Sequence, residues 1–384
     1  MSAANDVTEE ILRSLAETRA ATETVLSLYL DLDPGRFATG PARATEIDSL
    51  LDQAHRAIEA GERSHDERLA LRATLAEARE ILGGDRQWAR GARALALFVS
   101  KPLELSRTLR LPHPVSSAAI LSDVPFIAPL TEVGPLGRVC VALVDERFAR
   151  VLRGSAEQLR EATSFGDQVP GRQDQGGWSQ ARYQRSRLED VEHHLRHVAR
   201  ALHDLLRVAP YERLLIACTE PLWPRMLAKL HPEVRALLHQ PRLSLDVGDA
   251  AVEDVVRAVA PVLAGEQRAR EDSALAELRE RRGRDGDERT VVGLGAVLNA
   301  LVERRVQTLL YEAGLQAPGA LCPRCGWMDT AGDSCPVDGG AVEPRENILE
   351  DALRSAVSQS AEILALRERP ELGPLGGVAA TLRF

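Results

Sequence analysis

Two stretches of the sequence carry residue types and spacings that suit ligand binding or chemistry. The first, Phe165 to Arg187, reads FGDQVPGRQDQGGWSQARYQRSR. Its paired glycines let the backbone bend and approach another surface closely, its arginines suit phosphate, and its aromatic rings suit stacking on bases. A second interpretation stays open, which is a mobile and solvated surface loop. The candidate RNA contacts are Arg172, Gly176, Gly177, Trp178, Arg182, Tyr183, Arg185 and Arg187.

The second stretch, LCPRCGWMDTAGDSCPVDG, has the spacing of a zinc knuckle. Cys322 and Cys325 are separated by two residues, Cys335 follows after nine more, and Asp338 after a further two. Thiolates at two-residue spacing lie at the tip of a tight turn and bind one tetrahedral ion, and a carboxylate is an accepted zinc ligand. The sequence predicts a structural Zn²⁺ ion held by these four residues, because no general base is found beside them. The alternative is a metal-free remnant of such a loop.

Other aspartates and histidines are predicted to have ordinary roles. Asp145 and Asp246 each end a predicted strand, where aspartate serves turns and caps, so a two-metal nuclease is not predicted. His193 and His197 lie four residues apart on a predicted helix, but the glutamate of a zinc-protease motif is missing. That helix face is therefore predicted to be solvated or to face RNA, rather than to bind a metal.

Length and charge limit the classes of function. A chain of 384 residues exceeds one typical core and predicts two or three domains. The net charge of −9 argues against general coating of nucleic acid, so RNA contact should come from local arginine patches and weaken with salt. No membrane partner is predicted, since no apolar run approaches membrane-spanning length. No DNA partner is predicted either. The start MSAANDVTEEILRS lacks the basic and apolar regions of a signal peptide, which predicts a cytoplasmic protein.

The order of predicted elements is that of an α/β fold. It predicts an N-terminal domain with long helices over 1–130, a middle domain over 131–275 and a C-terminal domain over 285–384. Short apolar runs predict strands at 24–32, 92–100, 139–144, 147–152, 213–220, 243–247, 306–311 and 376–384. Helical periodicity predicts helices at 7–23, 43–82, 179–208, 221–238, 250–278 and 348–366, with Pro261 as a kink or break. The charged helices within 43–82 are expected to pair as a hairpin.

Together these motifs resemble the bacterial relatives of the archaeal and eukaryotic class-1 peptide release factors, a family that includes pelota. GGWSQARYQRSR matches the position of the family's Gly-Gly-Gln loop, and VVGLGAVLNALVERRVQTLLYEAG resembles the segment that opens domain three. The cysteine motif resembles that domain's zinc-bearing insertion, and GGVAATLRF its last strand. The N-terminal match, TVLSLYLDLDP with ALALFVSK, is weaker. The positions that keep the frame of the loop are Gly176, Gly177, Ser179, Arg182 and Tyr183.

The resemblance implies three α/β domains, the middle one RNase H-like and the third with a small zinc-knuckle insertion. It implies a factor that occupies the ribosomal A site, with ribosomal RNA and the peptidyl-transferase centre as partners and a translational GTPase as a candidate for delivery. In the family, the loop glutamine places the water that cleaves peptidyl-tRNA, and its backbone N–H stabilises the developing charge. Here Trp178 replaces that glutamine, and no counterpart of the Asn-Ile-Lys-Ser motif that reads stop codons is found.

Three hypotheses follow from these matches and departures. The leading one is a non-catalytic, ribosome-binding, release-factor-like translation factor, acting in hibernation like Balon-type factors or in rescue. The alternative is a peptidyl-tRNA hydrolase that uses the backbone of the candidate loop at Gly176, Gly177 and Trp178. A third is a scaffold whose partner is a protein, because fold alone does not give function.

Overall fold

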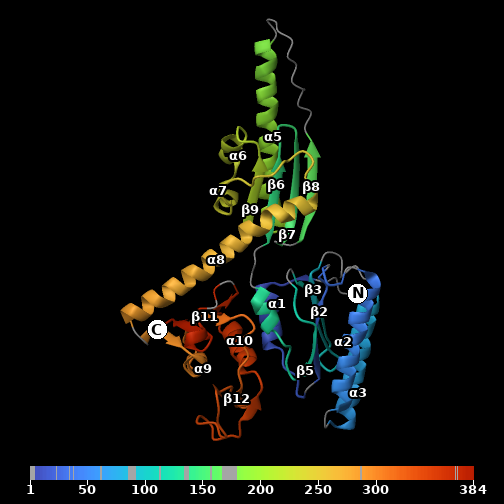
Figure 1. Ribbon diagram of the computed structural model, residues 1–384, viewed down its shortest axis with the longest axis vertical. Coiled ribbons are helices and arrows are strands. Elements are labelled where there is room, and N and C mark those ends of the chain that lie inside the picture. Colours follow the sequence, from blue (N-terminus) through green and yellow to red (C-terminus); the bar gives the residue numbers. More distant parts are fainter. Residues whose placement is uncertain are drawn as a thin grey trace. The chain divides into compact units, whose positions relative to one another are not determined.

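The computed structural model describes residues 5–22, 24–33, 35–37, 39–60, 63–84, 92–111, 114–133, 138–155, 158–166, 180–285, 288–367, 369 and 371–384. Its contacts divide the chain into two compact units, Met1–Pro135 with Glu266–Phe384, and Leu136–Gly265. Both units pack helices on sheets (Figure 1), which confirms the predicted α/β class. The three-domain boundaries stay a prediction. Among the described residues, no helix is both long enough and apolar enough to cross a bilayer.

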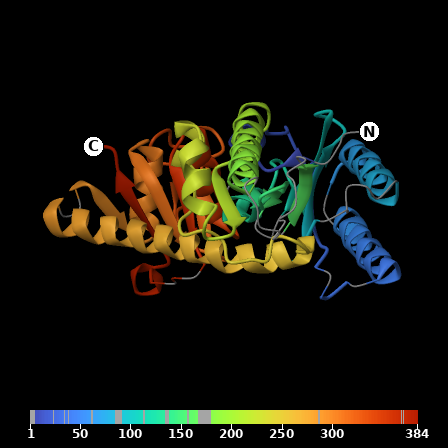
Figure 2. The same ribbon diagram turned by 90° about the horizontal axis from the view of Figure 1, so that it is seen from above.

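The N-terminal sheet is covered on both faces, and the alternation of its side chains explains why. Leu28 of β2 packs against the helical hairpin, whereas its neighbour Tyr29 packs against α1 on the other face. The predicted hairpin is confirmed, with Arg72 Nε 2.9 Å from Glu59 Oε1 across it (Figure 2). The sheet order is β1-β4-β3-β2-β5. The bounds are β1 Asn5–Asp6, α1 Glu9–Glu17, β2 Val25–Asp31, α2 Gly40–Ala60, α3 His65–Gly83, β3 Ala94–Ser100, β4 Leu105–Leu111, β5 Ala118–Ser122 and α4 Ala128–Val133.

The C-terminal sheet has the order β10-β16-β11-β15, and a small sheet, β13-β12-β14, is inserted after β11. The prediction of one helix over 348–366 is wrong. Ser360 adopts φ of 54°, in the left-handed region, and the chain turns there so that β15 pairs parallel with β11. The bounds are β10 Thr290–Val292, α9 Leu294–Val302, β11 Val306–Glu312, β12 Gly319–Leu321, β13 Met328–Asp329, β14 Glu343–Arg345, α10 Ile348–Ser358, β15 Glu362–Leu366 and β16 Val378–Leu382.

Helix α10 carries a buried carboxylate that caps a helix of the N-terminal part. Glu350 is 7% exposed, and its two oxygens accept hydrogen bonds from the backbone N–H groups of Ile127 (2.7 Å) and Ala128 (2.9 Å) at the start of α4. These N–H groups have no partner inside their own helix, and a negative charge suits a helix N-terminus.

One turn later, α10 carries a buried guanidinium that caps the C-terminal end of α1. Arg354 is 8% exposed and donates to the carbonyl oxygens of Leu15 (3.3 Å), Thr18 (2.9 Å) and Pro125 (3.2 Å). The first two carbonyls lie at the C-terminal end of α1, where a positive charge is favourable. Glu350 and Arg354 thus hold the first 135 residues and the last part of the chain in one unit.

The buried carboxylate predicts a pH dependence of stability. Burial raises the pKa of Glu350 to about 7, and the two N–H donors and Arg354 only partly oppose this. The folded state therefore binds the proton more tightly than the unfolded chain, in which a glutamate pKa is about 4.3. The group stabilises the fold below about pH 4.3, and this contribution is lost as pH rises through about 7. The free energy of unfolding of wild type minus that of Glu350→Gln, measured with denaturant, should be larger at about pH 5 than at about pH 8. A difference that does not change with pH would contradict this.

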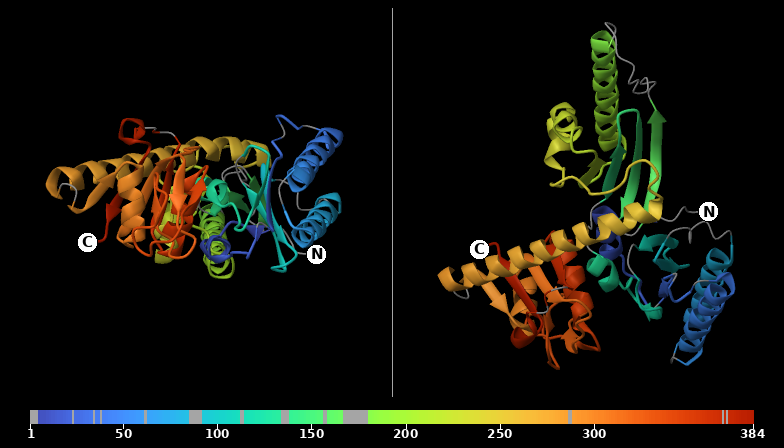
Figure 3. Two further views of the ribbon diagram at one scale, coloured as in Figure 1. Left: turned by 90° about the horizontal axis from the view of Figure 1, so that it is seen from below. Right: turned by 45° about the horizontal axis from the view of Figure 1, so that its top comes forward.

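The middle unit is built on the sheet β8-β7-β6-β9, an antiparallel meander followed by a parallel strand. This order fits the predicted RNase H-like layout. One face packs against α5, α6 and α7, and the other against the first part of α8 (Figure 3). The bounds are β6 Val139–Val144, β7 Phe148–Ser155, β8 Gln158–Gly166, α5 Gln180–Val208, β9 Arg213–Cys218, α6 Trp223–Lys229, α7 Pro232–Ala236 and α8 Val252–Asp285.

Three predictions for this unit are corrected by the structure. The strand over 243–247 is reduced to one parallel bridge between Leu243 and Ala217. The helix over 221–238 divides into α6 and α7, because Pro232 has no N–H to continue the ladder and restricts the residue before it. For Pro261, which was predicted to kink or break the helix, the break is wrong because α8 runs through it, and the kink stays a prediction.

Candidate functional site

The candidate RNA-binding loop connects β8 to α5. β8 ends at Gly166 and α5 begins at Gln180, and Val191 is the first core residue among those of α5 whose side chains the structure describes. At 1.5 Å per residue, the helix runs about 16 Å from Gln180 to Val191, and its first turns rise above the sheet (Figure 1). Four predicted contacts, Arg172, Gly176, Gly177 and Trp178, lie outside the described residues, as do the side chains of Arg182, Tyr183 and Arg185.

The base of this extended helix is tied to the sheet. Arg187, one of the predicted phosphate contacts, donates to the carboxylate of Glu146 in the β6–β7 turn. Asp145 in the same turn accepts from the N–H groups of Arg147 (2.6 Å) and Phe148 (2.5 Å), which confirms its predicted turn role. The guanidinium of Arg187 is thus already engaged by an acidic side chain, and its contact with RNA stays a prediction.

The histidine row on α5 is partly structural. His197 stacks on Phe165 at the end of β8, with ring centroids 4.4 Å apart, and His194 is fully buried. His193 is exposed. Within the described residues, neither His193 nor His197 belongs to a group of three potential ligands.

The predicted knuckle consists of two turns of the same form. In the first, the N–H of Gly326 donates to the carbonyl of Cys322 (2.9 Å), and the N–H of Cys322 donates to the carbonyl of Trp327 (2.7 Å). In the second, the N–H of Gly339 donates to the carbonyl of Cys335 (2.9 Å), and the N–H of Cys335 donates to the carbonyl of Gly340 (2.8 Å). Gly326 and Gly339 have φ of 76° and 67°, a conformation that favours glycine. The matching sequences Cys-Pro-Arg-Cys-Gly and Cys-Pro-Val-Asp-Gly are therefore matching turns.

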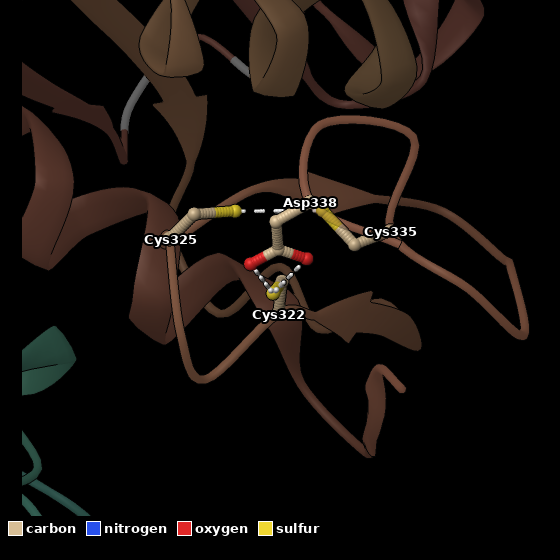
Figure 4. A group of neighbouring side chains, drawn as sticks. All are labelled: Cys322, Cys325, Cys335 and Asp338. Atoms are coloured by element: carbon tan, nitrogen blue, oxygen red, sulfur yellow. Dashed lines mark hydrogen bonds between the residues drawn. The ribbon is translucent and has the colours of Figure 1, made fainter. Parts of the chain in front are cut away.

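These turns bring the four predicted ligands together (Figure 4). The sulfurs of Cys325 and Cys335 are 3.4 Å apart, and the sulfur of Cys322 lies 3.7 and 3.6 Å from the two oxygens of Asp338. One donor atom from each residue lies within 4.8 Å of all the others. Tetrahedral zinc with Zn–S bonds of about 2.3 Å requires ligand atoms about 3.8 Å apart. The cluster could therefore hold a metal ion, as the spacing predicted.

Backbone N–H groups favour anionic ligands in this cluster. The N–H of Gly340, 2.9 Å from Asp338 Oδ1, lowers the pKa of that carboxyl group. The N–H of Cys325 lowers the pKa of the Cys322 thiol. At Cys325 the N–H of Trp327 lowers the pKa of the thiol, but desolvation and the neighbouring ligands outweigh it and raise this pKa to about 11. Metal binding requires deprotonated ligands, so the backbone favours a cation at Asp338 and Cys322 and not at every ligand.

Sequence reasoning missed a second group of potential ligands among the described residues. His203 on α5 lies beside His231 and Glu233, which flank the start of α7. The only signal was His-Pro-Glu at 231–233, inside a stretch that was predicted to be one continuous helix.

Residues 125–264 match the family model described as bacterial archaeo-eukaryotic release factor family 10. The match covers the middle unit and the helix α4 before it. The predicted resemblance to the release-factor family is confirmed. No curated protein matches the chain.

The solved structures that match this chain are similar to it only remotely. An archaeal translation termination factor, aRF1, shares 17% identity over 99% of both chains, with a TM-score of 0.28. Dom34 of S. cerevisiae, described as a translation termination-like factor, shares 12% identity over 76% of this chain and 79% of its own, with a TM-score of 0.41. An archaeal Pelota from a ribosome-bound model with ABCE1 shares 14% over 76% and 77%, also with a TM-score of 0.41. Identities and TM-scores this low carry no argument about function.

Proposed function

We propose that this protein is a ribosome-binding translation factor that occupies the A site without catalysing peptide release. One observation carries the proposal. The chain matches the release-factor family over 125–264, and within that range the Gly176-Gly177 segment falls between β8 and the extended first part of α5. A helix whose first turns precede its packed part suits a factor that must reach into a narrow cavity.

The absence of catalysis is proposed from one residue. Trp178 stands where the family has its glutamine, so the loop keeps a backbone N–H but loses the polar side chain that places the attacking water. The indole suits stacking on ribosomal RNA, and the arginines around it suit phosphate. A role in hibernation or rescue, in the cytoplasm and with a translational GTPase as the delivering partner, fits such a factor.

Ribosome binding is tested by sedimentation of stationary-phase lysate and of purified protein with 70S ribosomes. We expect the protein to travel with 70S particles, and the double variant Arg182→Glu, Arg185→Glu to lose about tenfold or more in affinity, since each hydrogen bond to a charged group contributes about 1.5–3 kcal/mol. A matched control, Arg235→Glu with Arg257→Glu, changes two exposed arginines elsewhere on the same unit and should bind normally. Absence of the wild-type protein from ribosomal fractions would reject the proposal.

Catalysis is tested by release of labelled peptide from stalled ribosomes. The wild-type protein should release peptide at the background rate, and Trp178→Gln tests whether the missing amide is what separates it from a release factor. Release by the wild type at the rate of a true factor would favour the hydrolase instead. Binding without release by either protein would place the loss of activity outside position 178.

We also propose that the knuckle binds structural Zn²⁺ through Cys322, Cys325, Cys335 and Asp338. The donor set is that of a zinc site, and the spacing of the donor atoms is close to tetrahedral. With all four positions filled by protein, no coordination site would remain for substrate, so the ion would stabilise the small sheet rather than react.

A further inference from the structure

A cluster of two histidines and one glutamate joins two helices of the middle unit. His203 Nε2 on α5 lies 3.3 Å from Oε2 of Glu233, and His231 Nδ1 lies 3.9 Å from the same oxygen. One donor atom from each of the three residues lies within 4.8 Å of the other two. The two imidazole rings stack, with centroids 4.0 Å apart and planes 19° apart.

We propose that His203, His231 and Glu233 form a second divalent-metal site, distinct from the knuckle. Two imidazoles and one carboxylate suit borderline ions, among which Zn²⁺ is common. Zinc bonds of about 2.0–2.2 Å to nitrogen and oxygen place neighbouring ligands about 3.3–3.6 Å apart, which the His203–Glu233 distance already meets. Three protein ligands leave a fourth position for water or for a group of a partner molecule.

Filling this site requires one local movement. The ring of His231 must rotate out of the stack so that Nδ1 points at the ion. Nδ1 now accepts only a long bond of 3.4 Å from the N–H of Glu233, and the side chain is 44% exposed, so little is lost in the rotation. The three backbone positions stay fixed, because α5 and α7 pack in the same core through Leu202 and Val234.

The ligand set consists of these three residues. Glu192, which links α5 to α6, is held by Arg225 (2.9 Å) and Lys229 (2.7 Å). It precedes His203 by eleven residues on α5, about 16 Å along the helix, so it is not a fourth ligand. The site contains no sulfur, which separates its chemistry from that of the knuckle.

Zinc content of the full-length protein tests the proposal, measured by elemental analysis after dialysis against Zn²⁺. Relative to wild type, His203→Ala, His231→Ala and Glu233→Gln should each lose one equivalent. The control His193→Ala removes an exposed histidine from the same helix and should keep the wild-type content. Unchanged zinc in His203→Ala would overturn the proposal and leave the cluster as an ion pair.

Cobalt substitution distinguishes this site from the knuckle. Co²⁺ bound to thiolates gives a sulfur-to-metal charge-transfer band, whereas a histidine and carboxylate site gives none. His203→Ala should therefore lose one equivalent of cobalt while the thiolate band stays unchanged. If the thiolate band fell with the lost equivalent, the metal would belong to the knuckle and the second site would be rejected.

Discussion

Replacing Cys335 with serine is expected to remove one bound zinc ion and to unfold the small sheet β13-β12-β14. Cys335 is 2% exposed, and its thiol lies at the centre of the second turn of the knuckle. Zinc binding contributes about 10–16 kcal/mol to the folding of zinc-finger peptides, and the three short strands of this insertion have little core of their own. Elemental analysis should show one equivalent less than wild type, and limited proteolysis should cut within 319–345.

Two further variants separate the metal from general damage to the insertion. Val337→Ser changes an exposed side chain, 66% accessible, between two ligands and should keep the zinc. Asp338→Cys replaces the carboxylate with a thiolate and should bind zinc more tightly than wild type, because thiolate is the softer ligand. A Cys335→Ser protein with the zinc content and protease resistance of wild type would show that the insertion folds without metal.

The knuckle was predictable because its ligands lie close together in the sequence. The two-residue spacing and the following glycine dictate each turn locally, so Cys322 and Cys325 needed no knowledge of the rest of the fold. The same is true of β2 and β3, whose mostly apolar runs become strands buried at every position. Local sequence signals were therefore sufficient to predict these core strands and the knuckle.

The missed features depend on contacts between distant residues. Glu350 binds N–H groups 223 and 222 residues away, and nothing around it in the sequence indicates a partner. His203 and His231 meet only because α5 and α7 pack side by side. β8 was missed because residues 161–164, Glu-Ala-Thr-Ser, are all exposed and mostly polar, so the strand lacks the apolar alternation that a sequence search detects.

Replacing Arg354 with alanine is expected to destabilise the unit formed by the two ends of the chain by about 3 kcal/mol or more, because each buried acceptor left unsatisfied costs about 1–3 kcal/mol. The truncation leaves the carbonyl oxygens of Leu15, Thr18 and Pro125 without their donor in a buried place. It also removes the positive charge that opposes the rise in the pKa of buried Glu350. The first effect weakens the contact between α10 and α1, and the second acts where Glu350 caps the start of α4.

Hydrogen exchange localises this effect, which a single unfolding midpoint cannot do for a chain of two units. Amides of α1 and α4 should exchange faster in Arg354→Ala, while amides of α5 in the middle unit should exchange at the wild-type rate and serve as an internal control. Arg284→Ala removes an exposed i, i+4 partner of Glu280 from α8 and should change stability by less than about 0.5 kcal/mol. If α1 keeps its protection without Arg354, the apolar contacts of Leu15 and Ala16 alone hold it in place, and the two ends of the chain do not depend on the buried charges of α10.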